Sequence, residues 1–400
     1  MLNYRLIIIA VLSTFIFFLN QYAFDGYIQN KESLAKELQS TSFNLSEWGL
    51  SKTPPFKYRI LFPLVVKGVS KIIPGGGSEN QKFYWSYLIL SWLFFIATSC
   101  MLYLLLLKIL KSISLSFLGV LLHLTMAPVL FAYTLPVHTR EDQLAFLFLL
   151  SAIYFLYDRK YAFYLIIICI GVFIRETLLL LPFLVLLFAK VSILQKLIFS
   201  ALPLLIWLIF RWQAGTEPYD FWLGLNWNLS NPFQLVFFSF LSFSYLWPPF
   251  LFSFRNNQNQ NDNIGLFSNK AVFLAVFMIF LTTFLFGIFN EIRLLYLIFP
   301  WVIISSLKHI AKHQDLWINF LKNKYVLITS ILMILLVVIF APFISVFSER
   351  ALGKNQYGVP YELWVISFLI YLIPTIFSII FYLYYQPQYK NDKLEAIKSK

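Results

Sequence analysis

Long apolar stretches recur along the whole sequence, and they limit the folds open to this chain more than any other feature. Twelve of them can be delimited, at residues 5–23, 83–107, 115–136, 143–157, 161–174, 177–189, 197–210, 233–253, 271–289, 294–307, 325–347 and 363–385. A soluble domain of 400 residues, 60% of them hydrophobic, could not bury so much apolar surface in one core. The sequence therefore predicts an all-α, polytopic integral membrane protein with about 12 membrane segments (10–13) in a lipid bilayer.

Two features refine this division of the chain. The first run lacks a small-residue cleavage site, so we expect a retained first helix and not a signal peptide. The runs 161–174 and 177–189 are short and are separated by charged residues, which favours two short segments meeting there over one long helix. We expect residues 1–310, including a long loop at 24–82, to form the membrane core. Residues 311–400 would form C-terminal membrane segments and a basic cytoplasmic tail.

The distribution of basic residues predicts the orientation. With a cytoplasmic N-terminus, the short loops that fall inside carry more Lys and Arg than the short loops outside, as the positive-inside rule requires. Both termini are then cytoplasmic in the inner (plasma) membrane. The net charge of +13 has a membrane explanation and does not require a nucleic acid partner. The same topology places four charged clusters at the outer face, around residues 25, 138–142, 175–176 and 291–293.

The long outer loop contains one segment with helical apolar spacing, FKYRILFPLVVKGVSKIIP. Tyr58, Leu61, Leu64, Val65 and Val69 follow this spacing, which predicts an amphipathic helix lying in the outer interface. Lys57 and Arg59 lie in the same segment, beside the membrane surface. Their long side chains either reach into the polar membrane interface, as Lys and Arg commonly do, or contribute to a substrate site.

The stretch HTRED, residues 138–142, places three consecutive ionised side chains between two apolar runs. One interpretation is a solvated turn whose acids stabilise the start of the next helix. The other is a polar rim site in which Glu141 or Asp142 handles a proton or a metal ion and Arg140 holds an anion.

Three further clusters allow the same two kinds of interpretation, because a charge at the centre of a membrane helix costs about 2.5–3.5 kcal/mol. Arg175 and Glu176 either order two short helices, or Arg175 faces a phosphate while Glu176 keeps its side chain in place. Glu291 and Arg293 would point roughly 200° apart on a continuous helix, so each needs another partner. Asp25 is either a helix-end carboxylate facing water or part of the site.

Taken together, the clusters predict an outer cavity lined by arginines and carboxylates, suited to a phosphate-bearing, membrane-resident substrate. The candidate catalytic residues are Asp25, Glu141 and Asp142. The candidate phosphate-binding residues are Arg59, Arg140, Arg175 and Arg293. The candidate supporting residues are His138, Glu176 and Glu291. No P-loop, HExxH or CxxC motif occurs in the sequence.

The remaining metal-binding and thiol side chains receive structural interpretations. His309 and His313 have the i, i+4 spacing of a metal-binding pair, but a solvated helix at the cytoplasmic face is favoured. Cys100 and Cys169 lie within apolar runs, as small core residues do.

The segments YRILFP, RED with LAFLFLL, RETLLLLP and NEIRLLYLIFP resemble the GT-C superfamily of polytopic glycosyltransferases, over roughly residues 5 to 310. The resemblance implies inverting transfer of a sugar from a polyprenyl-phosphate donor to a cell-envelope glycan or lipid acceptor. It implies that Asp25 is the general base and that Glu141 or Asp142 assists the acceptor or a metal. A divalent cation, Mg²⁺ or Mn²⁺, is left open as a cofactor. The alternatives are a transporter or flippase, or a polymerase, of a lipid-linked glycan, and a structural scaffold.

Overall fold

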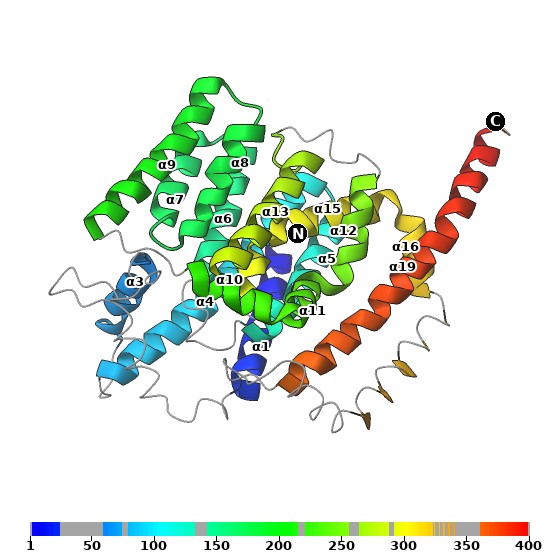
Figure 1. Cartoon of the computed structure of the whole chain (residues 1–400), viewed down its shortest axis with the longest axis horizontal. Helices are drawn as coiled ribbons and strands as arrows, with labels where there is room; N and C mark the ends of the chain where they lie inside the picture. Colours follow the sequence, from blue (N-terminus) through cyan, green and yellow to red (C-terminus); the bar gives the residue numbers. More distant parts are fainter. Residues whose placement is uncertain are drawn as a thin grey trace.

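The fold is described from a computed structural model, in which helices make up every regular element of the described residues (Figure 1). These residues are 2–24, 59–73, 79–132, 142–214, 221–255, 264–287, 292–322 and 361–398, with single positions between 324 and 340. The α-helices are α1 (Leu2–Phe24), α3 (Leu61–Ser70), α4 (Glu79–Leu110), α5 (Ile113–Leu124), α6 (Asp142–Tyr157), α7 (Tyr161–Gly171), α8 (Leu180–Phe188), α9 (Ile193–Ala214), α10 (Phe221–Ser230), α11 (Pro232–Phe243), α12 (Trp247–Arg255), α13 (Asn269–Phe286), α14 (Ile292–Leu295), α15 (Phe299–Lys312), α16 (Gln314–Lys322) and α19 (Tyr361–Lys398). The short π- and 3₁₀-segments are η4 (Pro128–Ala132), η5 (Glu176–Leu179), η6 (Ser244–Leu246) and η7 (Tyr296–Ile298).

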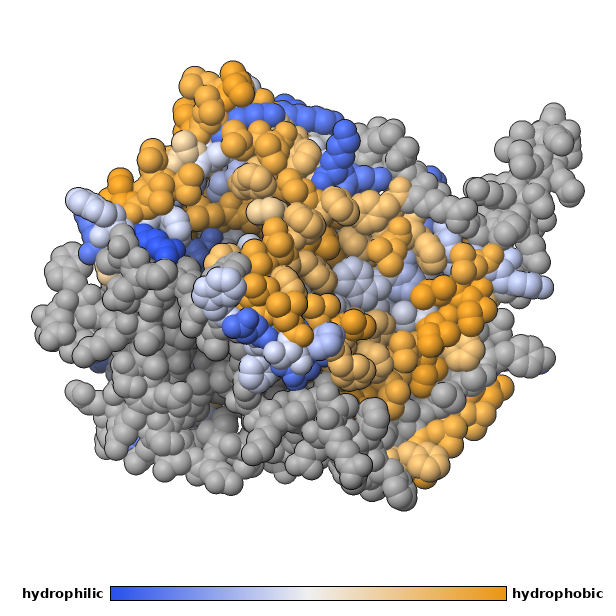
Figure 2. Space-filling view, in the orientation of Figure 1, coloured by the Kyte–Doolittle hydropathy of each residue, from blue (hydrophilic) through white to orange (hydrophobic). Residues whose placement is uncertain are grey.

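Five helical stretches of the described chain are long and apolar enough to cross a membrane. They are Gln81–Leu110, Ile193–Ala214, Pro232–Phe254, Asn269–Phe286 and Val365–Tyr384. Large apolar side chains lie exposed along these helices, and Figure 2 shows them gathered where Figure 1 places α7 to α9 and along α19. This exposure indicates a membrane-embedded protein, because soluble proteins rarely expose such large apolar surfaces to water. The total of about 12 segments stays a prediction, since most other runs form shorter helices and 325–347 lies largely outside the described residues.

Three apolar runs that we expected to be continuous helices are interrupted. In the run 115–136, α5 ends at Leu124 and the π-helical η4 follows from Pro128. The run 233–253 is divided by η6, where Ser244 has a positive φ of 41°, and the run 294–307 by η7. Prolines follow two of these breaks, in the first turns of α12 and α15, where a missing N–H costs no helical hydrogen bond.

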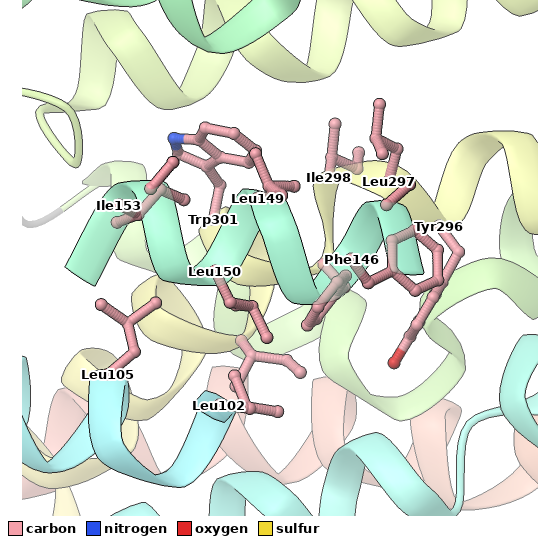
Figure 3. Close-up of a cluster of buried hydrophobic side chains, with 14 of the residues drawn as sticks. Leu102, Leu105, Phe146, Leu149, Leu150, Ile153, Tyr296, Leu297, Ile298 and Trp301 are labelled. Atoms are coloured by element: carbon pink, nitrogen blue, oxygen red, sulfur yellow. The ribbon is translucent and has the colours of Figure 1, made fainter. Parts of the chain in front are cut away.

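Helix α6 lies at the centre of the hydrophobic core. Figure 3 shows its residues Phe146 and Leu150 between side chains from α4 and from the segment that includes Tyr296 and Trp301. Trp301 is completely buried, and its Nε1 donates a hydrogen bond to the carbonyl of Leu266 at 3.1 Å. An apolar helix buried on several sides is typical of the interior of a bundle, so α6 serves as the central element.

Helix α3 confirms the helix expected in the long first loop, and it packs against α4. Phe62 and Val66 are its most buried residues, and the ring of Phe62 lies 5.3 Å from that of Tyr87. The predicted stripe through Leu61, Leu64, Val65 and Val69 is only partly buried, so the inward face is offset from it. Tyr58 and Lys57 lie outside the described residues, and the position of α3 in the membrane interface is not tested.

The expected break between 161–174 and 177–189 is confirmed. Helix α7 ends at Gly171, the N–H groups of Ile174 and Arg175 both bond back to its carbonyl, and η5 then leads into α8. A side chain at Gly171 would come within 2.9 Å of Leu178, so this position suits a residue without a Cβ. The break also holds α3, because the N–H of Leu61 donates to the carbonyl of Phe173 at 3.1 Å.

The C-terminal helix α19 packs against the preceding helices. The ring of Phe368 stacks on Phe237 of α11 with centroids 4.6 Å apart. The hydroxyl of Tyr371 donates to the carbonyl of Thr125, just after α5, at 2.6 Å. Residues beyond 310 therefore share contacts with the core, and the expected division of the chain at residue 310 stays a prediction.

Candidate ionic site at the start of helix α6

Two ion pairs join three distant parts of the chain beside the first turn of α6. The four residues are Arg59, two residues before α3, Asp142, the first residue of α6, and Arg175 and Glu176, at the break between α7 and α8. The sequence predicted that these charged residues lie on one face of the membrane. The structure brings these four together.

Arg59 and Glu176 form a two-pronged contact. Nη2 of Arg59 donates to Oε1 of Glu176 at 2.6 Å, and Nε donates to Oε2 at 3.1 Å. This parallel arrangement is the strongest geometry open to an arginine and a carboxylate. The two side chains are 9% and 18% exposed, so solvent reaches both of them to a small extent.

Arg175 and Asp142 form the deeper pair, with side chains only 2% and 0% exposed. Asp142 stands at the start of α6, where the helix dipole favours a negative charge. Its burial corrects the interpretation of HTRED as a solvated turn at this residue. Because the two charges neutralise each other, losing either one would leave an uncompensated charge in the interior.

The two neighbours in RET therefore have separate partners. Arg175 has an extended backbone, with φ −160° and ψ 127°, and successive side chains point in opposite directions along such a segment. The sequence interpretation in which Glu176 holds Arg175 in place needs correction, because the carboxylate of Glu176 bonds Arg59 and that of Asp142 pairs with Arg175.

The other candidate residues cannot be placed in this site. Asp25, His138, Arg140, Glu141 and Glu291 lie outside the described residues. The backbone of Arg293 lies in the short helix α14, and its side chain is not among those described. Their roles stay predictions.

A second ionic cluster marks the opposite end of α6. Asp158, in the turn after α6, pairs with Lys108 and, at 2.8 Å, with Lys160. Hydrogen bonds from Lys108 and then Lys160 lower the pKa of the Asp158 carboxyl. A 16-residue helix is roughly 24 Å long, so the two clusters are well separated.

Sequence reasoning missed a buried polar contact that packs against α6. Nδ1 of His123 lies 2.8 Å from the hydroxyl of Tyr296, and both residues are fully buried. The ring of Tyr296 packs on Phe243 and Phe299, and Figure 3 shows it beside Phe146 of α6. The sequence signal that could have revealed this contact is His123, a polar residue inside the apolar run 115–136.

Among the described residues, no group of three or more His, Cys, Asp or Glu side chains could hold a metal ion. His309 and His313 have ring centroids 4.7 Å apart. The expected solvated helix is wrong for His309, which is fully buried because Phe252 and Tyr382 cover it. The divalent cation that the sequence left open is not tested by this observation.

Comparison with known proteins leaves the family of this chain undetermined. No protein-family model, curated protein or solved structure matches the sequence or the fold. The resemblance to the GT-C superfamily therefore rests on the sequence segments alone, and the geometry of the ion pairs is the starting point for the function.

Proposed function

We propose that this protein is an integral membrane glycosyltransferase that transfers a sugar from a polyprenyl-phosphate donor to a glycan or lipid acceptor of the cell envelope. The observation that carries the proposal is the pair of ionic contacts, Arg59–Glu176 and Arg175–Asp142, beside the first turn of α6. Arginines suited to phosphate thus stand next to carboxylates suited to proton transfer. In the proposed orientation the site is on the outer face of the plasma membrane and both termini are cytoplasmic.

The difference in burial between the two pairs suggests their order of use. Arg59 and Glu176 are slightly exposed, whereas Arg175 and Asp142 are not. The donor phosphate would therefore meet Arg59 first, taking the place of the Glu176 carboxylate, and Arg175 would add positive charge behind it. A buried guanidinium stabilises the negative charge that develops on the leaving phosphate.

The chemical step is a displacement at the anomeric carbon. A carboxylate accepts the proton of the acceptor hydroxyl, the acceptor oxygen forms the new bond to the sugar, and the bond between sugar and phosphate oxygen breaks. Asp142 is the described candidate for this carboxylate, with Asp25 and Glu141 as the candidates outside the described residues.

Turnover of the purified protein in nanodiscs tests the proposal. Radiolabelled polyprenyl-phosphate sugars are mixed with acceptors from membrane extracts, and transfer of label is measured. We expect Asp142→Asn to reduce transfer by at least about 100-fold, the size of a typical general-base contribution. Asp158→Asn is the matched control, because it makes the same change at the other end of α6, and it should retain transfer. Intact donor with every sugar tried would refute the proposal.

A transporter or flippase of a lipid-linked glycan is the second candidate. The helix interruptions at η6 and η7 favour it, because discontinuous helices commonly form the substrate sites of transporters. Tyr296 of η7 packs on Phe243, directly before η6, so the two breaks meet. Movement of a fluorescent lipid-linked sugar across proteoliposomes, without transfer of the sugar, would support this candidate over the glycosyltransferase.

A further inference from the structure

We propose that Gln143 binds hydroxyl groups of the sugar carried by the donor, and so determines whether the site prefers a glycosylated lipid over the bare lipid phosphate. This inference rests on the proposed function and assigns a residue that the ion pairs do not involve. Gln143 directly follows Asp142 in the first turn of α6.

The side chain of Gln143 is buried and its hydrogen-bonding groups are unused. Only 6% of the residue is exposed, and within the described part of the chain neither Nε2 nor Oε1 has a hydrogen-bond partner. Buried amides are almost always paired in folded proteins, because an unpaired one loses its bonds to water without replacement. A buried amide kept in this state therefore points to a partner that is bound during function.

The position of Gln143 is held by its backbone. The hydroxyl of Thr98, on α4, donates a hydrogen bond to the carbonyl of Gln143 at 3.0 Å. Phe146, one turn further along α6, packs against Tyr296 and Phe299. These contacts fix the backbone of the first turn of α6, so the point from which the side chain of Gln143 extends is defined before a ligand binds.

The chemistry of the amide matches a sugar better than a phosphate. A glutamine side chain offers a donor and an acceptor next to each other, and neighbouring sugar hydroxyls offer an acceptor and a donor in return. Phosphate has only acceptors and carries charge, and the nearby arginines suit it better. Because Gln143 follows Asp142 in the chain, it would lie against the sugar while the ion-pair arginines hold the phosphate.

Binding measurements test this assignment separately from turnover. Dissociation constants are measured in nanodiscs for undecaprenyl phosphate, undecaprenyl-phosphoglucose and undecaprenyl-phosphomannose, and thermal unfolding is recorded for each variant. We expect the wild-type protein to prefer at least one sugar-bearing lipid. Gln143→Leu should weaken binding of that lipid about tenfold, leave binding of undecaprenyl phosphate unchanged, and keep or raise the melting temperature, because it removes an unpaired polar group.

Gln234→Leu is the matched control, since Gln234 is a buried glutamine on α11. This variant should retain the preference for the sugar-bearing lipid. If Gln143→Leu also retains the preference, the assignment of Gln143 is overturned and the proposed function stands. If Gln143→Leu lowers the melting temperature and weakens all three lipids equally, its role is structural and the assignment is likewise overturned. If the wild-type protein does not distinguish the three lipids, the assignment of Gln143 is overturned, whereas the proposed function is decided by the transfer assay alone.

Discussion

Asp142 and Arg175 form an ion pair that is almost fully enclosed by protein, between the first residue of α6 and the extended residue that separates α7 from α8. The pair fixes the start of the central helix against a break in the helical chain. It also brings together two of the charged clusters that the sequence placed on one face of a membrane.

We expect Arg175→Met to lower the free energy of unfolding by about 3–5 kcal/mol, because the carboxylate of Asp142 then stays buried without its partner. Thermal unfolding in nanodiscs measures the effect. The double variant Asp142→Asn, Arg175→Met should lose less than the sum of the single variants, since it removes both charges. Additive losses would mean that the two side chains do not stabilise each other.

Arg59→Lys should loosen α3 without unfolding the bundle. Lysine cannot reproduce the two parallel hydrogen bonds to Glu176, and a bond to a charged group contributes about 1.5–3 kcal/mol. Hydrogen–deuterium exchange should be faster across Leu61–Ser70 and unchanged in α6. Lys67→Arg, a basic exchange within α3 itself, is the control. Protection of α3 equal to wild type in Arg59→Lys would contradict a holding role for the contact.

The ionic cluster around Asp158 should make the stability of the folded protein depend on pH. Lys108 and Lys160 hold the pKa of Asp158 below its usual value, so the carboxylate binds its proton less readily in the folded protein than in the unfolded chain. Its stabilisation is therefore complete above the unfolded pKa, near 3.8, and is lost as the pH falls through the lower folded value. Melting temperatures of the wild type and Asp158→Asn should differ at pH 7 and converge in acid. A constant difference between pH 7 and pH 3 would contradict this origin.

Tyr296→Phe should cost about 1–3 kcal/mol, because it leaves Nδ1 of His123 buried without its hydrogen bond. A double-mutant cycle with His123→Phe measures the coupling, which should be at least about 0.5 kcal/mol for residues in direct contact. Tyr164→Phe is the control, since the described residues offer the buried hydroxyl of Tyr164 no hydrogen-bond partner. A coupling of zero would mean that the contact does not stabilise the interruption at η7.

Asn228→Leu should destabilise the packing of α10 on α13. The side-chain amide of Asn228 donates to the carbonyls of Phe284 and Gly287, each at 2.9 Å, and so satisfies the end of α13. The loss should be about 1–3 kcal/mol by thermal unfolding. Asn231→Leu is the control, because its amide donates to the carbonyl of Trp227, four residues earlier in the chain. An equal effect of both variants would argue against a special role for Asn228.

The sequence predicted the helices α6 and α13 closely, because each coincides with an apolar run bounded by polar residues. It also predicted the break at Arg175 and Glu176, since two charges in an apolar run are visible without a structure. It could not predict which carboxylate each arginine meets, because that depends on how α3, α6 and α7 pack. Hydropathy averaged over a run also hides a single 3₁₀ turn such as the one at Tyr296, where every side chain is still apolar or aromatic.

The break between α7 and α8 has a consequence for how the chain is made. These helices have 11 and 9 residues, so each is about 14–17 Å long and neither spans a bilayer by itself. A ribosome delivers Arg59 and Asp142 well before it delivers Arg175 and Glu176. When the segment that contains α7 and α8 leaves the translocon, both of its charges can be neutralised at once by partners that are already in the membrane. The order of the residues along the chain therefore suits co-translational assembly. Earlier segments provide the opposite charges for a later segment whose unpaired charges would make its insertion into lipid unfavourable.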